Sequence, residues 1–255
     1  MEKIQQLKEK VKNRISEYLE FDVNEIFNVA DYITIYGGAV RDSIAGMEIN
    51  DVDILCMPDS AKKLKDYILK YNYTPIELYD EDAINMYRGI SVISEPWTFI
   101  NYNKKIIQII RPRFYTNKMS TYSKEYTEAY TNLIKNVDFS CCGVFLEKRN
   151  DELELKESCR NGIVHCLSKS YEINHWAILY NSNRAIYREH KLSSRGWVNL
   201  DDDKYPWNKK ELKNKERSLK IMNLEFNLDQ KYKIWTEEEY LNRKKETSSI
   251  TDLPF

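Results

Sequence analysis

The sequence predicts an α+β fold, because strand-like and helix-like patterns alternate along its first two thirds. Residues 2–19 place apolar side chains at three- and four-residue steps, which is typical of one helix face. Residues 32–36 and 51–55 are short strand-like runs, separated by a diglycine and a helical pattern. Residues 97–110 hold two further strand-like runs around Asn103-Lys104 and predict a β-hairpin. These elements favour a sheet flanked by helices.

The composition is that of a globular protein of one large or two modest domains. The chain has 255 residues, of which 42% are hydrophobic and 13% aromatic. The 39 basic residues are balanced by 40 acidic ones, so a basic surface for nucleic acid would require local clustering of lysines and arginines. Five cysteines without CxxC spacing favour reduced thiols in the cytoplasm. No apolar run approaches the roughly 20 residues of a membrane helix, and the charged N-terminus is unlike a signal peptide, so we expect no membrane contact.

A diglycine stands between the first strand and the following helix. Gly37 and Gly38 lack a Cβ atom, so the backbone can approach a ligand and offer N–H groups to a phosphate. Arg41 is expected on the first turn of the helix, where its guanidinium can reach the same anion. The segment therefore predicts a phosphate site.

Two aspartates follow on the next strand. Asp51 and Asp53 are two residues apart, so their side chains share one face while Val52 and Ile54 turn to the core. Two carboxylates this close repel each other unless a cation neutralises them, and Mg²⁺ takes one or two carboxylates together with phosphate oxygens. We predict a site for Mg²⁺ or Mn²⁺. The alternative is a tight turn and an ordinary surface strand.

The spelling GGAVRD followed by DVD, in residues 37–53, resembles the signature of the polymerase-beta-like nucleotidyltransferases. It is most similar to the head domain of class II CCA-adding enzymes and bacterial poly(A) polymerases. The resemblance implies a mixed sheet flanked by helices and the transfer of a nucleoside monophosphate from an NTP to an acceptor hydroxyl. By the same resemblance, Asp51 and Asp53 are the catalytic metal ligands, and Gly37, Gly38 and Arg41 handle the triphosphate.

A second segment, residues 136–147 (NVDFSCCGVFLE), resembles the family's RRDFTxNA motif. Asp138 stands at the motif's aspartate and is a candidate nucleotide-binding residue. Asn136 and Val137 replace the arginines that normally contact ribose and phosphate, and Cys142 replaces the asparagine. These departures put nucleotide selection by the motif in doubt.

A third segment, residues 171–197, is predicted to be helical and resembles the family's neck helix, which carries an EDxxR motif. Counting back from Gly196 places Arg184 at the motif's arginine and Asn181 at its aspartate. These two residues lie at i and i+3, on one helix face. Arg188 lies one turn further along, so all three are candidate nucleotide-binding residues; structural roles for them are the alternative.

The hairpin's second strand holds two further candidates. Arg111, at the strand's end, could meet phosphate, and a surface arginine is an equal alternative. Many members of the superfamily bring a third carboxylate from a strand near here, but the candidate position is Gln108, which cannot replace an ionised ligand. The class II branch generally manages with two carboxylates.

Other patterns carry weaker predictions. Ser60 is a candidate N-cap of a helix whose outer lysines form a solvated face or touch RNA. Residues 73–79 predict a strand in which Pro75 favours an edge position or a strand start. Cys159, with His165 and Cys166, lacks the second closely spaced pair that a structural zinc site requires.

We divide the chain into a catalytic head, residues 1–168, and a helical neck-like segment with a charged C-terminal region, residues 169–255. The expected reaction uses an NTP and a divalent cation, with a tRNA-like RNA 3′ end as acceptor. Nucleotidylation of a protein or small molecule, as by toxins and defence proteins, is the alternative, favoured by the near-neutral charge. A degenerate head that binds nucleotide or RNA without catalysis is a third possibility. The sequence does not specify the oligomeric state.

Overall fold

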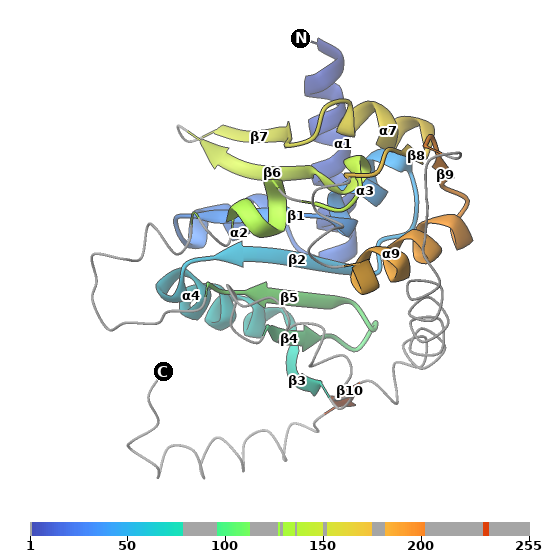
Figure 1. Ribbon diagram of the computed structural model, residues 1–255. Helices are drawn as coiled ribbons and strands as arrows, with labels where there is room; N and C mark the ends of the chain where they lie inside the picture. Colours follow the sequence, from blue (N-terminus) through green and yellow to red (C-terminus); the bar gives the residue numbers. More distant parts are fainter. Residues whose placement is uncertain are drawn as a thin grey trace.

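A mixed β-sheet forms the centre of the computed structural model (Figure 1). Within the described part of the chain, eight strands follow the order β10-β3-β4-β5-β2-β1-β6-β7. Their bounds are β1 Ile33–Tyr36, β2 Asp51–Cys56, β3 Thr74–Leu78, β4 Trp97–Ile100, β5 Ile106–Ile110, β6 Val144–Arg149, β7 Glu152–Glu157 and β10 Tyr232–Ile234. The structure describes residues 2–78, 96–112, 127, 130–135, 137–149, 152–174, 182–201 and 232–234.

The sheet is mixed because β2 and β5 run parallel, whereas the other neighbouring pairs of its described strands are antiparallel. Two short strands, β8 (Ser170–Tyr171) and β9 (Val198–Asn199), pair in parallel outside this sheet. The predicted α+β class, a mixed sheet flanked by helices, is confirmed.

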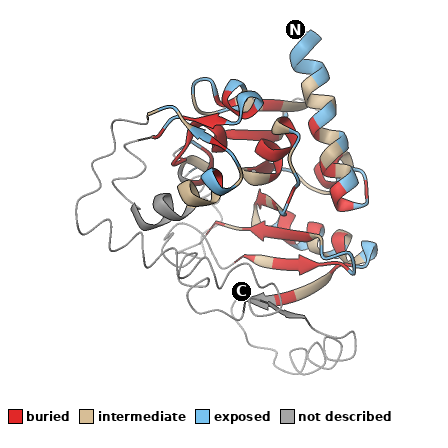
Figure 2. Ribbon diagram, turned by 90° about the vertical axis from the view of Figure 1, so that its right-hand side faces the viewer, coloured by how far each residue is buried: buried red, intermediate tan, exposed pale blue. Residues whose placement is uncertain are grey.

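Helices pack their apolar sides on one face of the sheet. Side chains of the first four helices form one buried cluster with Val52 and Ile54 of β2 and with Ile107 and Ile109 of β5. Figure 2 shows most of the central strands and the inner sides of the helices as buried, whereas the edge strand β7 is mostly intermediate or exposed. The helices are α1 Glu2–Leu19, α2 Val23–Val29, α3 Gly38–Ala45, α4 Pro58–Ile68, α7 Gly162–Ser168 and α9 Ser182–Ser194. Burial of such apolar faces is the main favourable contribution to folding.

The opposite face of the sheet carries a smaller apolar cluster, to which the π-helical turn Thr131–Lys135 contributes. Its buried members are Tyr36, Leu55, Ile110, Leu133, Ile134 and Phe145. Asp51 and Asp53 share the face of Leu55, because side chains two residues apart on a strand lie on the same side. The predicted carboxylate site therefore lies on the face with the smaller core.

Several predicted elements are confirmed, with local corrections. The helix over residues 2–19 and the hairpin of β4 and β5 are present. Pro75 lies near the start of β3, where the pairing with β10 has not yet begun. Ser60 is not the N-cap of α4: that position is Met57, and the Ser60 hydroxyl donates to the Asp31 carbonyl at 2.7 Å.

The prediction of a helix over residues 171–197 is wrong at both ends. Tyr171 belongs to β8, where it pairs with Asn199 of β9, and α9 ends at Ser194 before the positive φ of Gly196. In the part of the chain that the structure describes, no helix is long and apolar enough to cross a membrane.

Candidate functional site

The site is built on the diglycine turn between β1 and α3. Gly37 precedes α3 with φ 71° and ψ −129°, a backbone conformation that is essentially restricted to glycine. Its N–H donates to the Val144 carbonyl at 3.3 Å, which ties the turn to the start of β6. The helix begins at Gly38, so its first N–H groups emerge at this turn.

Asp51 and Asp53 lie directly against the turn. A Cβ atom placed on Gly38 would lie 3.7 Å from Asp51 Oδ1, and one on Gly37 would lie 3.9 Å from Asp53 Oδ2. Both aspartates are half-buried, whereas Val52 between them is fully buried. The structure thus brings together the two glycines and the two carboxylates that the sequence predicts to act together.

The donor set fits a hard divalent cation. Asp51 and Asp53 offer two carboxylates on one face, and such a cation completes its coordination with water and phosphate oxygens. Among the described residues, no group of three or more histidines, cysteines, aspartates or glutamates is placed to hold a metal. Ligand oxygens would therefore have to supply the remaining coordination. The N-terminus of α3 beside the carboxylates favours an anion such as a phosphate.

Arg41 is part of the site but is held from within the protein. Its Nε donates to Asp42 Oδ1 at 2.8 Å, its Nη2 to Asp42 Oδ2 at 3.1 Å and its Nη1 to Cys142 Sγ at 3.5 Å. The guanidinium also lies 5.4 Å from the ring centre of Trp197. Burial disfavours its charge, but the Asp42 carboxylate more than offsets this and raises the pKa of Arg41. A Cβ on Gly38 would be 3.7 Å from Nη2, so this fixed charge borders the diglycine turn.

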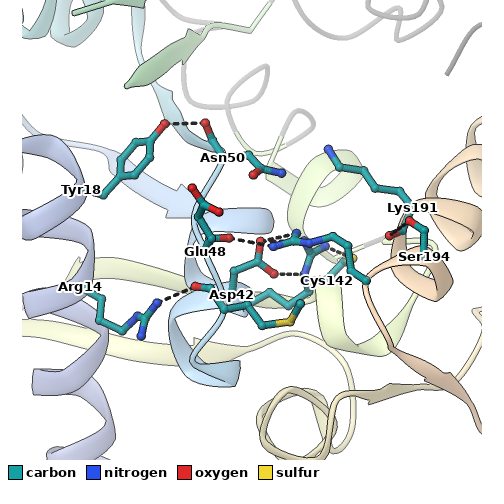
Figure 3. A network of polar contacts seen from close by, with 11 residues as sticks. Arg14, Tyr18, Asp42, Glu48, Asn50, Cys142, Lys191 and Ser194 are labelled. Carbon is teal, nitrogen blue, oxygen red and sulfur yellow. Dashed lines mark hydrogen bonds and ion pairs between the residues drawn. The ribbon is translucent and has the colours of Figure 1, made fainter. Parts of the chain in front are cut away.

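Asp42 connects this arginine to the region beyond α9. Arg195 Nη1 donates to Asp42 Oδ2 at 2.8 Å, and its Nη2 donates to the Glu48 carbonyl at the same distance. Figure 3 shows the Asp42 carboxylate between the two guanidinium groups, with Cys142 beside them. We assigned no role to Asp42 or Arg195 from the sequence, although both stand within the segments that carry the family resemblance. The adjacent arginine and aspartate in the spelling GGAVRD were the sequence feature that could have indicated this ion pair.

Asp138 and Arg188 form a second ion pair between the sheet region and α9. Arg188 Nη1 donates to Asp138 Oδ2 at 2.8 Å, and Asp138 is buried. Burial opposes the charge of Arg188, but Asp138 more than offsets this and raises the pKa of the guanidinium. The structure thus brings these two predicted residues together, bonded to each other. Asn181 and the side chain of Arg184 lie outside the described residues.

Cys142 lies between the two ion pairs. A hydrogen bond from Cys141, together with the charges of Arg41 and Arg188, lowers the pKa of the Cys142 thiol from 9.0 to about 6, against the opposing effect of burial. Cys142 is thus part of the electrostatics of the site.

The structure also shows where two other residues considered in the sequence analysis lie, Arg111 and His165. Arg111 lies over the ring of Trp97 at 3.8 Å from its centre, and Trp97 packs against the main core, on the face of the sheet opposite Asp53. The structure therefore does not group Arg111 with the carboxylates. His165 Nδ1 is 2.6 Å from Ser140 Oγ, a buried contact that links α7 to the turn before β6.

Comparison with solved structures finds CCA-adding enzymes. An apo form matches over 88% of this chain and 46% of its own, at 17% identity and a TM-score of 0.46. The Thermotoga maritima enzyme complexed with tRNA matches over 88% and 47%, at 14% identity and a TM-score of 0.47. A complex with CTP matches over 97% and 55%, at 12% identity and a TM-score of 0.47. The chain spans about half the length of these enzymes.

The other two comparisons concern the sequence. No curated protein matches the chain. A family profile described as "Gad2: Gabija anti-defense 2 family protein" matches residues 5–165, which include the diglycine turn, both carboxylates, Asp138 and Cys142.

Proposed function

The chain belongs to the Gabija anti-defense 2 family, and from this premise we propose that it is a nucleotidyltransferase. It transfers a nucleoside monophosphate from an NTP to an acceptor hydroxyl. The observation that carries the proposal is the position of the half-buried carboxylates of Asp51 and Asp53, which lie within 4 Å of where Cβ atoms on Gly38 and Gly37 would stand. This arrangement offers a cation and a phosphate adjacent places.

The proposed reaction forms one bond and breaks one. The acceptor oxygen bonds to the α-phosphorus, the bond from that phosphorus to the β-phosphate oxygen breaks, and pyrophosphate leaves while the acceptor's proton passes to solvent. A divalent cation, Mg²⁺ or Mn²⁺, would supply charge neutralisation at the phosphates. Asp51 and Asp53 would hold it, and Gly37 and Gly38 would admit the triphosphate to the N-terminus of α3.

The remaining residues would orient the nucleotide from the side of α9. Arg41 presents a fixed positive charge at the diglycine turn because Asp42 holds its guanidinium. Arg188 and Asp138 join α9 to the turn before β6. Residues 1–168 would thus be the catalytic head and residues 169–255 a neck-like segment with a charged C-terminal region. Asn181, Arg184 and Arg111 stay predicted nucleotide contacts.

Two acceptors are proposed in turn. An RNA 3′ end, tRNA-like, follows from the sequence resemblance to CCA-adding enzymes. The family's description as Gabija anti-defense favours a second candidate, a hydroxyl on a protein or small molecule of that defence system. The near-neutral net charge of −1 is compatible with a protein acceptor.

The test uses the purified full chain with each α-labelled NTP, Mg²⁺ or Mn²⁺, and either total RNA or an extract of cells that carry a Gabija system. We expect label on one acceptor class, and at least about a 100-fold loss of label in Asp51→Asn/Asp53→Asn, since even outer-shell partners of a metal contribute 10- to 100-fold. The matched control is Asp66→Asn, which removes an exposed aspartate on α4. Salt-sensitive labelling of RNA supports the first acceptor, and label on protein or a small molecule supports the second.

A cellular experiment separates catalysis from binding alone. Phage plating is measured on cells that carry a Gabija system and express the wild type, the double variant or Asp66→Asn. Rescue of plating by the wild type and the control, but not by the double variant, supports catalysis. Equal rescue by the double variant, together with no labelling by the wild type, would instead identify a head that binds without transferring.

A further inference from the structure

A row of side chains extends from the carboxylates across three neighbouring strands. Asp53 of β2 is in register with Gln108 of β5, and Gln108 is in register with Thr98 of β4. Registered partners on adjacent strands present their side chains on the same face of a sheet. Strand spacing is about 4.8 Å, so Gln108 lies roughly 5 Å and Thr98 roughly 10 Å along the sheet from Asp53. The row is therefore short enough for a single nucleotide or acceptor group to span.

The row is polar where its surroundings are apolar. The next position beyond Thr98 is Ile76, and Leu55 and Ile110 lie on the same face. Gln108 is 2% exposed and Thr98 is 3% exposed, whereas Asp53 is half-buried. The row thus opens to solvent at its carboxylate end.

Thr98 has a feature that packing does not explain. Its Oγ1 is buried and has no hydrogen-bond partner among the residues that the structure describes. Buried hydroxyls are nearly always bonded, because an unmade hydrogen bond leaves the full cost of desolvation. Valine would fill the same volume on the strand without that cost. Thr74 of β3 provides a contrast, because its hydroxyl donates to the Ile100 carbonyl at 3.2 Å.

We propose that Gln108 and Thr98 form an uncharged hydrogen-bonding subsite beside the carboxylates, which receives a hydroxyl group of a bound substrate. The proposal rests on the proposed nucleotidyl transfer. A hydroxyl can donate and accept, which matches an amide next to a threonine hydroxyl. Because both groups are neutral, the subsite adds no charge to the repulsion between Asp51 and Asp53. The hydroxyl comes either from the acceptor or from the ribose of the NTP.

The decisive variant is Thr98→Val, which removes the hydroxyl and keeps the shape. Thermal unfolding of the variant is expected at the wild-type temperature or above, because an unbonded buried hydroxyl has been replaced. Steady-state transfer is expected to show a KM about 3- to 10-fold higher for one substrate, the change that corresponds to one neutral hydrogen bond. Gln108→Met, which keeps the length of the side chain but not its amide, is expected to raise the same KM.

Thr74→Val is the matched control. It removes a bonded hydroxyl from the same face of the sheet, so it is expected to lower the unfolding temperature and leave both KM values unchanged. Thr98→Val is thus expected to change a KM without lowering the unfolding temperature, and Thr74→Val to lower the unfolding temperature without changing a KM.

The identity of the affected KM distinguishes the two sources of the hydroxyl. A higher KM for the acceptor alone assigns the subsite to the acceptor. A higher KM for NTP, with reduced discrimination against the matching 2′-deoxy- or 3′-deoxy-NTP, assigns it to the ribose. Unchanged KM values in Thr98→Val, with wild-type transfer intact, would overturn the subsite and leave the proposed function standing. Absence of transfer by the wild type would overturn both.

Discussion

Asp42 follows the diglycine turn on α3 and the pair of Asp51 and Asp53 lies beside that turn, but their surroundings are opposite. Asp42 is 2% exposed and is bonded by the guanidinium groups of Arg41 and Arg195, one of them from beyond α9. Asp51 and Asp53 are half-buried and lie against glycine backbone. A carboxylate enclosed by two fixed cations holds elements together, whereas carboxylates that keep contact with solvent beside an open turn can take a ligand.

The comparison is tested most strongly by removing one charge in each environment. Asp42→Asn is expected to lower the free energy of unfolding by about 3 kcal/mol, because it leaves the buried guanidinium of Arg41 and the half-buried guanidinium of Arg195 without their carboxylate. Asp53→Asn is expected to change it by about 1 kcal/mol or less, since it also relieves repulsion from Asp51. Urea denaturation measures both.

The control for this pair is Asp66→Asn, whose effect is expected within about 0.5 kcal/mol because the residue is exposed. An equal loss of stability in the Asp42 and Asp53 variants would contradict the distinction between a structural and a ligand-binding carboxylate.

A second prediction concerns the thiol in the structural network. The pKa of Cys142 is lowered to about 6 from 9.0, so the unfolded state binds more protons between these values. Its contribution to stability is therefore largest at high pH, declines as pH falls from 9 and is lost below about 6. The difference in unfolding free energy between the wild type and Cys142→Ser should grow steadily from pH 6 to pH 8.

The measurement is denaturation across that pH range, under reducing conditions. Cys56→Ser is the matched control, because burial raises the pKa of Cys56 to about 12 and its titration lies outside the range. A pH-independent difference for Cys142→Ser would show that the thiol stays protonated.

The smallest expected effect is stabilisation by the cation alone. At tenfold excess over the dissociation constant, Mg²⁺ or Mn²⁺ is expected to add about 1.4 kcal/mol to the unfolding free energy of the wild type. Asp51→Asn/Asp53→Asn should lose this stabilisation by the cation. Asp42→Asn should keep it, although its unfolding free energy without the cation is lower than that of the wild type. Equal stabilisation of the wild type and the double variant would place cation binding elsewhere.

Local patterns predicted much of the fold. The three- and four-residue spacing of apolar side chains predicted α1, and short strand-like runs predicted the strands up to β5. The glycines and the two carboxylates were recognised together because their spacing in the chain is short. Ser60 was misassigned, because a serine before an apolar helix face is an N-cap signal even when Pro58 has already begun the helix.

The long-range partners were not predictable in the same way. Asp42 meets Arg195 over 153 positions, Asp138 meets Arg188 over 50, and Arg41 meets Cys142 over 101. The charged residues in these contacts are common in surface patterns, and only packing removes them from water and supplies their partners. Asp138 and Arg188 were predicted as separate nucleotide contacts, and the structure bonds them to each other.

The sequence by itself determined the chemistry available at the turn: two glycines that free the backbone and two carboxylates on one strand face, all within residues 37–53. These are properties of adjacent residues, which local geometry fixes. Tertiary structure decided which charges are neutralised internally and which neighbour Asp53 receives, because strand register placed Gln108 beside it and Thr98 one strand further along. Register and burial depend on contacts between distant segments, so they arise only when the whole sheet has formed.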